Sequence, residues 1–132
     1  MQLLIQAFIG FVLLALPVLS ATLSITVPPE TEKSRRLVLH FEDLKLPPNS
    51  GGLVRVFADL PSANAHTDVD DEHFLGYFTV IPKTSGEAAA GVSRRHVTLD
   101  VTQKKQFLSG KKDVTLTLVP AVTVGRAYLA AD

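Results

Sequence analysis

Apolar residues alternate with polar ones along most of the chain after residue 20, and turn-forming residues interrupt this alternation at short intervals. Leu23, Ile25 and Val27 form one such run, and Pro28-Pro29 ends it. A period of two places every second side chain on the same side of an extended strand, so each run buries one face. Several short runs of this kind, separated by turn signals, are typical of an antiparallel β-sandwich.

The alternation predicts an all-β domain over residues 21–132, an antiparallel seven-stranded sandwich of the immunoglobulin-like or jelly-roll-like type. The runs lie at residues 23–27, 37–41, 54–58, 73–81, 97–101, 114–118 and 122–128. The expected core positions are Leu39, Phe41, Val54, Val56, Phe74, Phe78, Leu99, Leu116 and Leu118. The run His73 to Ile81 is apolar at both parities, which predicts a central strand.

Two other segments have a different pattern. A short helical turn is expected between Thr102, as its cap, and Gly110, as its stop. The segment Lys83 to Ser93 is rich in glycine, alanine and small polar residues, so a loop between two strands is expected there. Neither segment changes the fold class.

The first twenty residues contain no charged side chain. The apolar run 3–19 is slightly longer than the apolar part of most signal peptides and short for a membrane span. Pro17 breaks a helix near its end, and small residues follow, which favours a cleaved export signal over residues 1–20 with the cut after Ser20 or Ala21. Because no lysine or arginine precedes the run, an uncleaved anchor is the alternative. A secreted or extracytoplasmic location is expected, with membrane contact only if the leader is uncleaved.

The charge and cysteine content excludes several classes of function. Lys+Arg and Asp+Glu each number 13, and there is no cysteine. A nucleic-acid partner is not expected, because such binders usually carry a basic excess that neutralises phosphates. Without cysteine there is no disulfide, thiolate nucleophile or zinc–thiolate site. The sequence also has no phosphate-binding glycine loop and no nucleophile-elbow pattern, so neither a cofactor nor enzyme activity is expected.

The number of histidines limits copper chemistry. A coupled copper pair that activates dioxygen needs about three imidazoles per ion, and the four present are His40, His66, His73 and His96. His40 and His96 fall within strand runs, where each is expected to be an unliganded surface residue.

The densest group of potential ligands lies between His66 and His73. Its weak metal candidates are His66, Asp68, Asp70 and His73. The segment lacks the glycine and the ligand spacing of a calcium-binding helix–loop–helix motif. The favoured interpretation is a solvated loop whose aspartates cap backbone amides before the next strand.

Two motifs in the middle of the chain belong together. They are Val54 to Ala65 (VRVFADLPSANA) and Asp70 to Phe78 (DDEHFLGYF). This order of a strand, a Pro-small-Asn-Ala loop, an acidic turn and an aromatic-x-Gly-x-Phe strand resembles the C-terminal β-sandwich domain of tyrosinases and plant-type polyphenol oxidases. The segments Asp113 to Pro120 and Val122 to Gly125 are similar to the final hairpin of that domain. The resemblance runs over residues 36–129.

The resemblance implies a domain that is not itself the catalyst. In that family a copper-binding helical bundle precedes the sandwich. The sandwich covers the mouth of the active site until it is removed, often with one side chain over the copper pair. This sequence departs from the family pattern in two respects. The expected export leader takes the place of the copper bundle, and Val54-Arg55-Val56-Phe57 replaces the usual Lys-Phe-Asp-Val signature.

The expected function is therefore that of an exported, non-catalytic accessory domain that shields or assists a copper oxidase of the tyrosinase type in trans. The expected partner contacts are Leu75, Tyr77, His66 and Asp71, although core packing is the favoured role for the first two. A free-standing extracellular structural or adhesion domain is the alternative. An enzyme or metal carrier that uses the loop between His66 and His73 is the least favoured reading.

Overall fold

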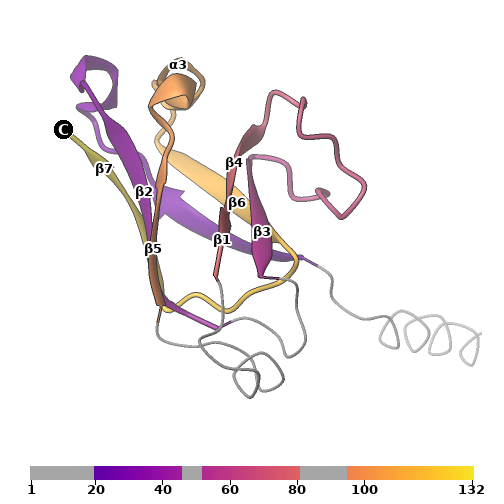
Figure 1. The fold of residues 1–132 in the computed structure, drawn as a ribbon. Helices are drawn as coiled ribbons and strands as arrows, with labels where there is room; N and C mark the ends of the chain where they lie inside the picture. The colour runs from indigo at the N-terminus through magenta and orange to yellow at the C-terminus, as the bar shows by residue number, and fades with distance from the viewer. Residues whose placement is uncertain (1–19, 46–51, 81–94) are drawn as a thin grey trace, which may run out of the picture.

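The chain folds into two antiparallel β-sheets that pack face to face, in a computed structural model that describes residues 20–45, 52–80 and 95–132 (Figure 1). The strands are β1 Ala21–Thr26, β2 Leu37–Leu44, β3 Leu53–Ala58, β4 Phe74–Thr79, β5 Arg95–Asp100, β6 Asp113–Val119 and β7 Arg126–Ala131. The predicted all-β sandwich of seven strands is confirmed. The predicted signal segment and the predicted loop Lys83 to Ser93 lie outside the described residues, except for Ser20.

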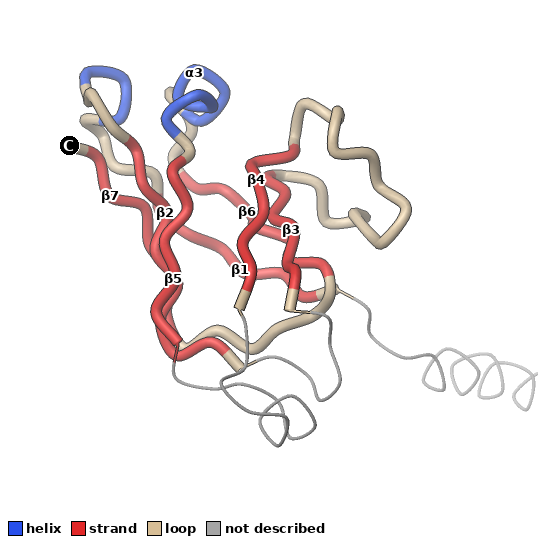
Figure 2. The backbone as a smooth tube through the Cα atoms, in the orientation of Figure 1, coloured by secondary structure: helices blue, strands red, loops and turns tan. Residues whose placement is uncertain are grey.

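One sheet has the strand order β1-β6-β3-β4 and the other has the order β5-β2-β7 (Figure 2). β4 is therefore an edge strand, and the prediction that it is central is wrong. Its apolar residues at both parities have another cause: a register shift opposite Val56 and Phe57 places a β-bulge in the strand. A bulge adds one residue to one strand, so the alternation changes parity along its length.

The core fills the space between the two sheets. Seven of the nine expected core residues are buried: Leu39, Phe41, Val54, Val56, Phe78, Leu116 and Leu118. Burying a side chain of this size stabilises the fold by roughly 1.5–3 kcal/mol, so these positions supply much of the driving force. The other two, Phe74 and Leu99, are only partly buried at the margin of the core.

A helical turn is present where the sequence predicts it, as the short elements η2 (Thr102–Lys104) and α3 (Lys105–Leu108). Gly110 follows with a φ of 84°, as expected of a glycine that ends a helical segment. The predicted cap is wrong, because Val101 occupies the N-cap position and Thr102 is the first residue of η2. Its hydroxyl instead accepts a hydrogen bond from Leu37 N (3.0 Å) and donates one to Asp100 Oδ1 (2.6 Å).

The last strand begins later than the alternation predicts. Val122 and Val124 precede β7 and pack on the core from an extended segment, where Thr123 forms an isolated bridge with Lys45. A second short turn, η1 (Thr31–Lys33), links β1 to β2. None of the described helices is long and apolar enough to cross a membrane.

Candidate functional site

The segment between β3 and β4 projects from the four-stranded sheet on the side away from β2, β5 and β7 (Figure 1). It has a small core of its own on the outer face of β3. Phe57, Ala63 and Val119 are buried there, with Leu60 and Phe74 packed against them. Because β3 alternates, Phe57 points into this second cluster while Val56 points into the main core. The segment is therefore packed against the sandwich.

Arg55 holds the far part of this segment to the strand. Its Nη2 donates a hydrogen bond to the carbonyl oxygen of Ala65 at 3.0 Å, and its Nη1 donates one to the carbonyl oxygen of Thr67 at 3.3 Å. A guanidinium presents several donors in a fixed plane, so one side chain can bind two neighbouring carbonyls. This contact fixes the position of the loop over β3.

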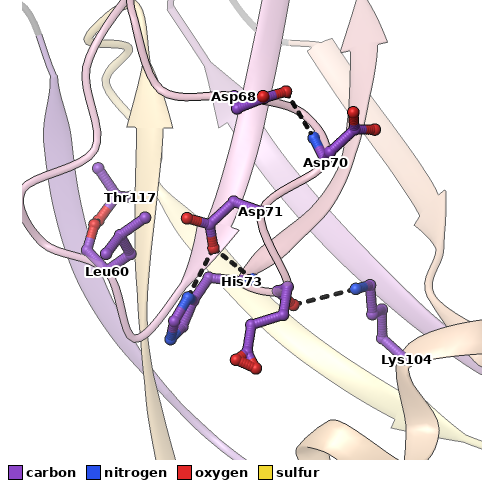
Figure 3. A network of polar contacts seen from close by, with 8 residues as sticks. Leu60, Asp68, Asp70, Asp71, His73, Lys104 and Thr117 are labelled. Carbon is purple, nitrogen blue, oxygen red and sulfur yellow. Dashed lines mark hydrogen bonds and ion pairs between the residues drawn. The ribbon is translucent and has the colours of Figure 1, made fainter.

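Polar side chains within the loop bind its backbone, as predicted. In each case a side-chain oxygen accepts a hydrogen bond from the backbone amide two residues further along. The pairs are His66 N to Asn64 Oδ1 (2.8 Å), Asp70 N to Asp68 Oδ1 (2.9 Å) and His73 N to Asp71 Oδ1 (2.8 Å). Figure 3 shows the last two of these contacts. This is the turn geometry that Asn and Asp favour, and the predicted capping role of the aspartates is confirmed.

Asp71 and His73 form the best-connected pair of the loop. Asp71 Oδ1 lies 2.7 Å from His73 Nδ1, and the pKa of Asp71 is lowered by hydrogen bonds from the His73 backbone amide and then from its imidazole. The His73 ring meets the edge of Phe107 with centroids 5.6 Å apart. At the neighbouring residue Glu72, the backbone carbonyl oxygen accepts a hydrogen bond from Lys104 Nζ at 3.0 Å, which joins the loop to η2 (Figure 3).

The four weak metal candidates do not come together as one set of ligands. Across residues 20–45, 52–80 and 95–132, no three histidine, aspartate or glutamate side chains gather as ligands for one ion. The side chains of His66, Asp68 and Asp70 are exposed, whereas His73 is half-buried beside Asp71. The loop is built to hold its own backbone conformation.

The base of the loop is anchored to β6. Asp59 has a φ of 55°, and its carboxylate accepts a hydrogen bond from Thr115 N at 3.1 Å and pairs with Lys111 Nζ at 3.2 Å. Partial burial raises the pKa of Asp59, but these hydrogen bonds and the lysine charge outweigh it, so the net pKa is lowered. Thr117 Oγ1 also donates to the carbonyl oxygen of Leu60 at 3.0 Å.

The two predicted partner contacts on β4 differ in exposure. Leu75 is buried in the main core, which confirms its favoured packing role, whereas Tyr77 is 59% exposed, so core packing is wrong for it. Tyr77 is paired in register with Arg55, so both belong to the outer face of the sheet. The large apolar side chains that are exposed within the described part of the chain are Leu53, Val69 and Tyr77.

We refer to Leu53, Val69 and Tyr77 as the outer apolar group. Leu53 has the same parity on β3 as Arg55, and Val69 lies two residues after the carbonyl that Arg55 binds. Sequence reasoning missed Leu53 and Val69. The parity of Leu53, opposite to that of the core residue Val54, was a usable signal. For Val69, within an acidic loop, no pattern was available.

Comparison with known proteins identifies the fold. No protein-family model matches the chain, and no curated protein sequence matches it significantly. Among solved structures, a latent aurone synthase (polyphenol oxidase) matches 87% of the chain with a TM-score of 0.57 and 17% identity. A latent apple tyrosinase matches 86% of the chain with a TM-score of 0.59 and 18% identity.

These matches cover only part of the matched enzyme chains. The chain spans only 24% of the aurone synthase chain and 26% of the apple tyrosinase chain, about a quarter of each. At this level of identity the likeness concerns the fold. The resemblance to tyrosinases and plant polyphenol oxidases is thus confirmed at the level of the fold, which this chain shares with about a quarter of each enzyme.

Proposed function

We propose that this chain is an exported, non-catalytic accessory domain that shields or assists a copper oxidase of the tyrosinase type in trans. The observation that carries the proposal is Tyr77, an exposed aromatic side chain on a rigidly built face of a fold shared with latent polyphenol oxidases. The absence of a catalytic role is supported by the short match, which covers a quarter of those enzymes.

The outer apolar group supports a docking role on physical grounds. Leu53 and Tyr77 lie on the same face of the paired strands β3 and β4, and large apolar side chains that share a face mark interaction sites more often than scattered single ones do. Tyr77 combines a large contact area with few rotatable bonds, which makes tyrosine common among the residues that dominate binding. Arg55 and the second cluster already fix the adjoining loop, so binding costs little further ordering.

The remaining expected contacts have different roles in the proposal. Leu75 is buried and takes no part. Asp71 holds the loop through His73, so its contribution is to position the surface. The His66 side chain is exposed in the loop, where a partner can reach it. Tyr77 is then the side chain that would enter the substrate channel of the partner oxidase and block it sterically.

The test uses the apple tyrosinase with the matched quarter of its chain removed as the probe. Adding the full chain should raise the apparent KM for a catechol or abolish turnover. A Tyr77→Ala variant should lose this effect, whereas Tyr128→Ala, which removes the only other tyrosine, from the opposite sheet, should retain it. Unchanged kinetics at saturating concentrations of the chain would contradict shielding and favour the free-standing structural or adhesion domain.

A further inference from the structure

The outer face of the three-stranded sheet brings two histidines together. His40 lies on β2, the central strand, and His96 lies on the neighbouring edge strand β5. His40 Nδ1 and His96 Nε2 are within hydrogen-bond distance of each other, at 3.2 Å, and the ring centroids are 5.4 Å apart. His96 is exposed and His40 is half-buried, so water reaches the pair. The two residues are 56 positions apart in the sequence, so only strand pairing makes them neighbours.

The ring of His40 is held in place by the third strand. Tyr128 of β7 stacks on it with ring centroids 4.6 Å apart and an angle of 5° between the planes. The guanidinium carbon of Arg126 lies over the Tyr128 ring, 4.5 Å from its centroid. Glu42 is engaged by both, since it accepts from the Tyr128 hydroxyl at 3.4 Å and pairs with Arg126 at 3.7 Å. One imidazole is therefore oriented before any ligand arrives.

The separation of the two nitrogens fits a shared metal ion. Two imidazole nitrogens bound to one tetrahedral zinc ion, each about 2.0–2.1 Å from it, lie about 3.3 Å apart. We propose that Nδ1 of His40 and Nε2 of His96 bind one transition-metal ion, Cu²⁺ or Zn²⁺. In the bound form each neutral ring carries its proton on its other nitrogen, Nε2 of His40 and Nδ1 of His96, so the ring that donates the hydrogen bond in the free pair changes tautomer when the metal binds.

The site has only two protein ligands among the described residues, because no third histidine, aspartate or glutamate joins the pair there. Water takes the remaining positions, since His96 is exposed and His40 is only half-buried. A two-ligand site of this kind binds an ion reversibly. Imidazole donors bind Cu²⁺ more tightly than Zn²⁺, so copper is the preferred ion.

This site is independent of the proposed function. The histidine pair lies on the sheet β5-β2-β7, whereas the outer apolar group belongs to β3, β4 and the loop between them. The experiment below measures metal binding alone, so its failure would leave the shielding proposal unaffected.

The test is a titration of the full-length chain with Cu²⁺ by calorimetry and with Zn²⁺ by NMR of the imidazole nitrogens. One ion per chain is expected, with shifts at His40 and His96 and tighter binding of Cu²⁺. His40→Gln and His96→Gln should each weaken binding by about tenfold or more, since even partners outside the coordination sphere contribute that much. Binding should also weaken as the pH falls and protons compete for the nitrogens.

The matched control is His66→Gln, which removes an exposed imidazole from the opposite side of the sandwich and should leave the affinity unchanged. Thermal unfolding of each variant confirms that it folds, as expected for substitutions of surface residues. Zinc-induced shifts confined to His66 or His73, or a His96→Gln variant that binds as tightly as the original chain, would overturn the proposal.

Discussion

The Leu99 side chain on β5 approaches Gly76 on β4 so closely that a Cβ at residue 76 would lie 3.1 Å from Leu99 Cδ1. Gly76 also has a φ of 144°, a conformation that L side chains rarely adopt. It lies in the bulged part of β4, next to the buried Leu75. The aromatic-x-Gly-x-Phe pattern thus has a structural cause, because the glycine lets the two sheets meet at this edge.

Replacing this glycine should destabilise the domain. Gly76→Ala is expected to cost about 1–3 kcal/mol, from backbone strain together with the crowding of Leu99. Gly110→Ala is the matched control, since Gly110 also has a positive φ but has nothing within 4 Å of a Cβ. Its cost should be smaller, about 1 kcal/mol. Equal losses in urea unfolding for the two variants would show that the close approach contributes nothing.

Truncating two neighbouring aromatic residues on β4 should change the stability of the domain by very different amounts. Phe78 is buried and packs on Phe41 with centroids 5.3 Å apart, so Phe78→Ala should cost roughly 3–5 kcal/mol. Tyr77→Ala removes an exposed ring and should change stability by less than about 0.5 kcal/mol. Thermal unfolding distinguishes them, and a Phe78→Ala variant with an unchanged Tm would contradict the placement of the strand.

Much of the fold could be predicted because alternation is a local signal. The parity of residues along β2, β3 and β6 identifies the side chains of the main core, and Val54 and Val56 are buried there as that parity requires. It does not identify Phe57 and Val119, which are buried at the opposite parity in the second cluster. The position of a strand within its sheet is not local. β4 has apolar residues at both parities because of a bulge and a second cluster, and this imitates the pattern of a central strand.

The site could be predicted only in part, for the same reason. The capping aspartates of the loop act on residues two positions away, so their role could be inferred from the sequence. The contact between His40 and His96 arises from the pairing of β2 with β5, and each appeared as a lone strand histidine. Likewise, Thr102 was expected to act on its own helix, whereas its hydroxyl binds Leu37 and Asp100.

Acid should weaken the fold through Asp100. Hydrogen bonds from the Thr102 hydroxyl and then from the Thr102 amide lower the pKa of Asp100 below its usual 3.8. A lowered carboxyl pKa contributes stability that is fully present above the unfolded value and is lost as the pH falls through the folded value. The free energy of unfolding should therefore decrease as the pH is lowered from about 5 through 3.8.

An Asp100→Asn variant tests this dependence, since it keeps an acceptor oxygen and removes the titrating group. Its free energy of unfolding, measured by urea denaturation at several pH values, should fall less steeply in acid than that of the original chain. Some slope should remain, because the pKa values of Asp59 and Asp71 are lowered as well. Identical slopes for the two proteins would exclude a role for Asp100.

Removing the Arg55 side chain should loosen the loop locally. An Arg55→Met variant loses both hydrogen bonds to the loop carbonyls, and we expect faster amide exchange at Thr67 and Asp71, whose amides bond within the loop. The global cost should be about 1 kcal/mol. Arg36→Met is the control, since Arg36 is exposed and pairs only loosely with Asp100 at 3.7 Å. Unchanged exchange in the loop would contradict the role of Arg55.

The chain should not oxidise phenols, with or without added copper. A coupled copper pair needs about three imidazoles per ion, and the sequence contains four histidines in all. The four histidines also lie in two separate places. His40 and His96 share one face of the three-stranded sheet, while His66 and His73 belong to the loop on the other sheet. A single ion on the His40–His96 pair has no second ion beside it with which to share dioxygen.

The measurement is catechol oxidation by the purified chain, compared with a blank that contains the same copper without protein. Activity at or below the blank is the expected result, also under conditions in which calorimetry shows one copper ion bound. The His40→Gln/His96→Gln double variant serves as a control, because it should match the original chain in this assay while it loses the metal. Oxidation above the blank that disappears on chelation would contradict a non-catalytic role, and its loss in the double variant would assign it to this pair.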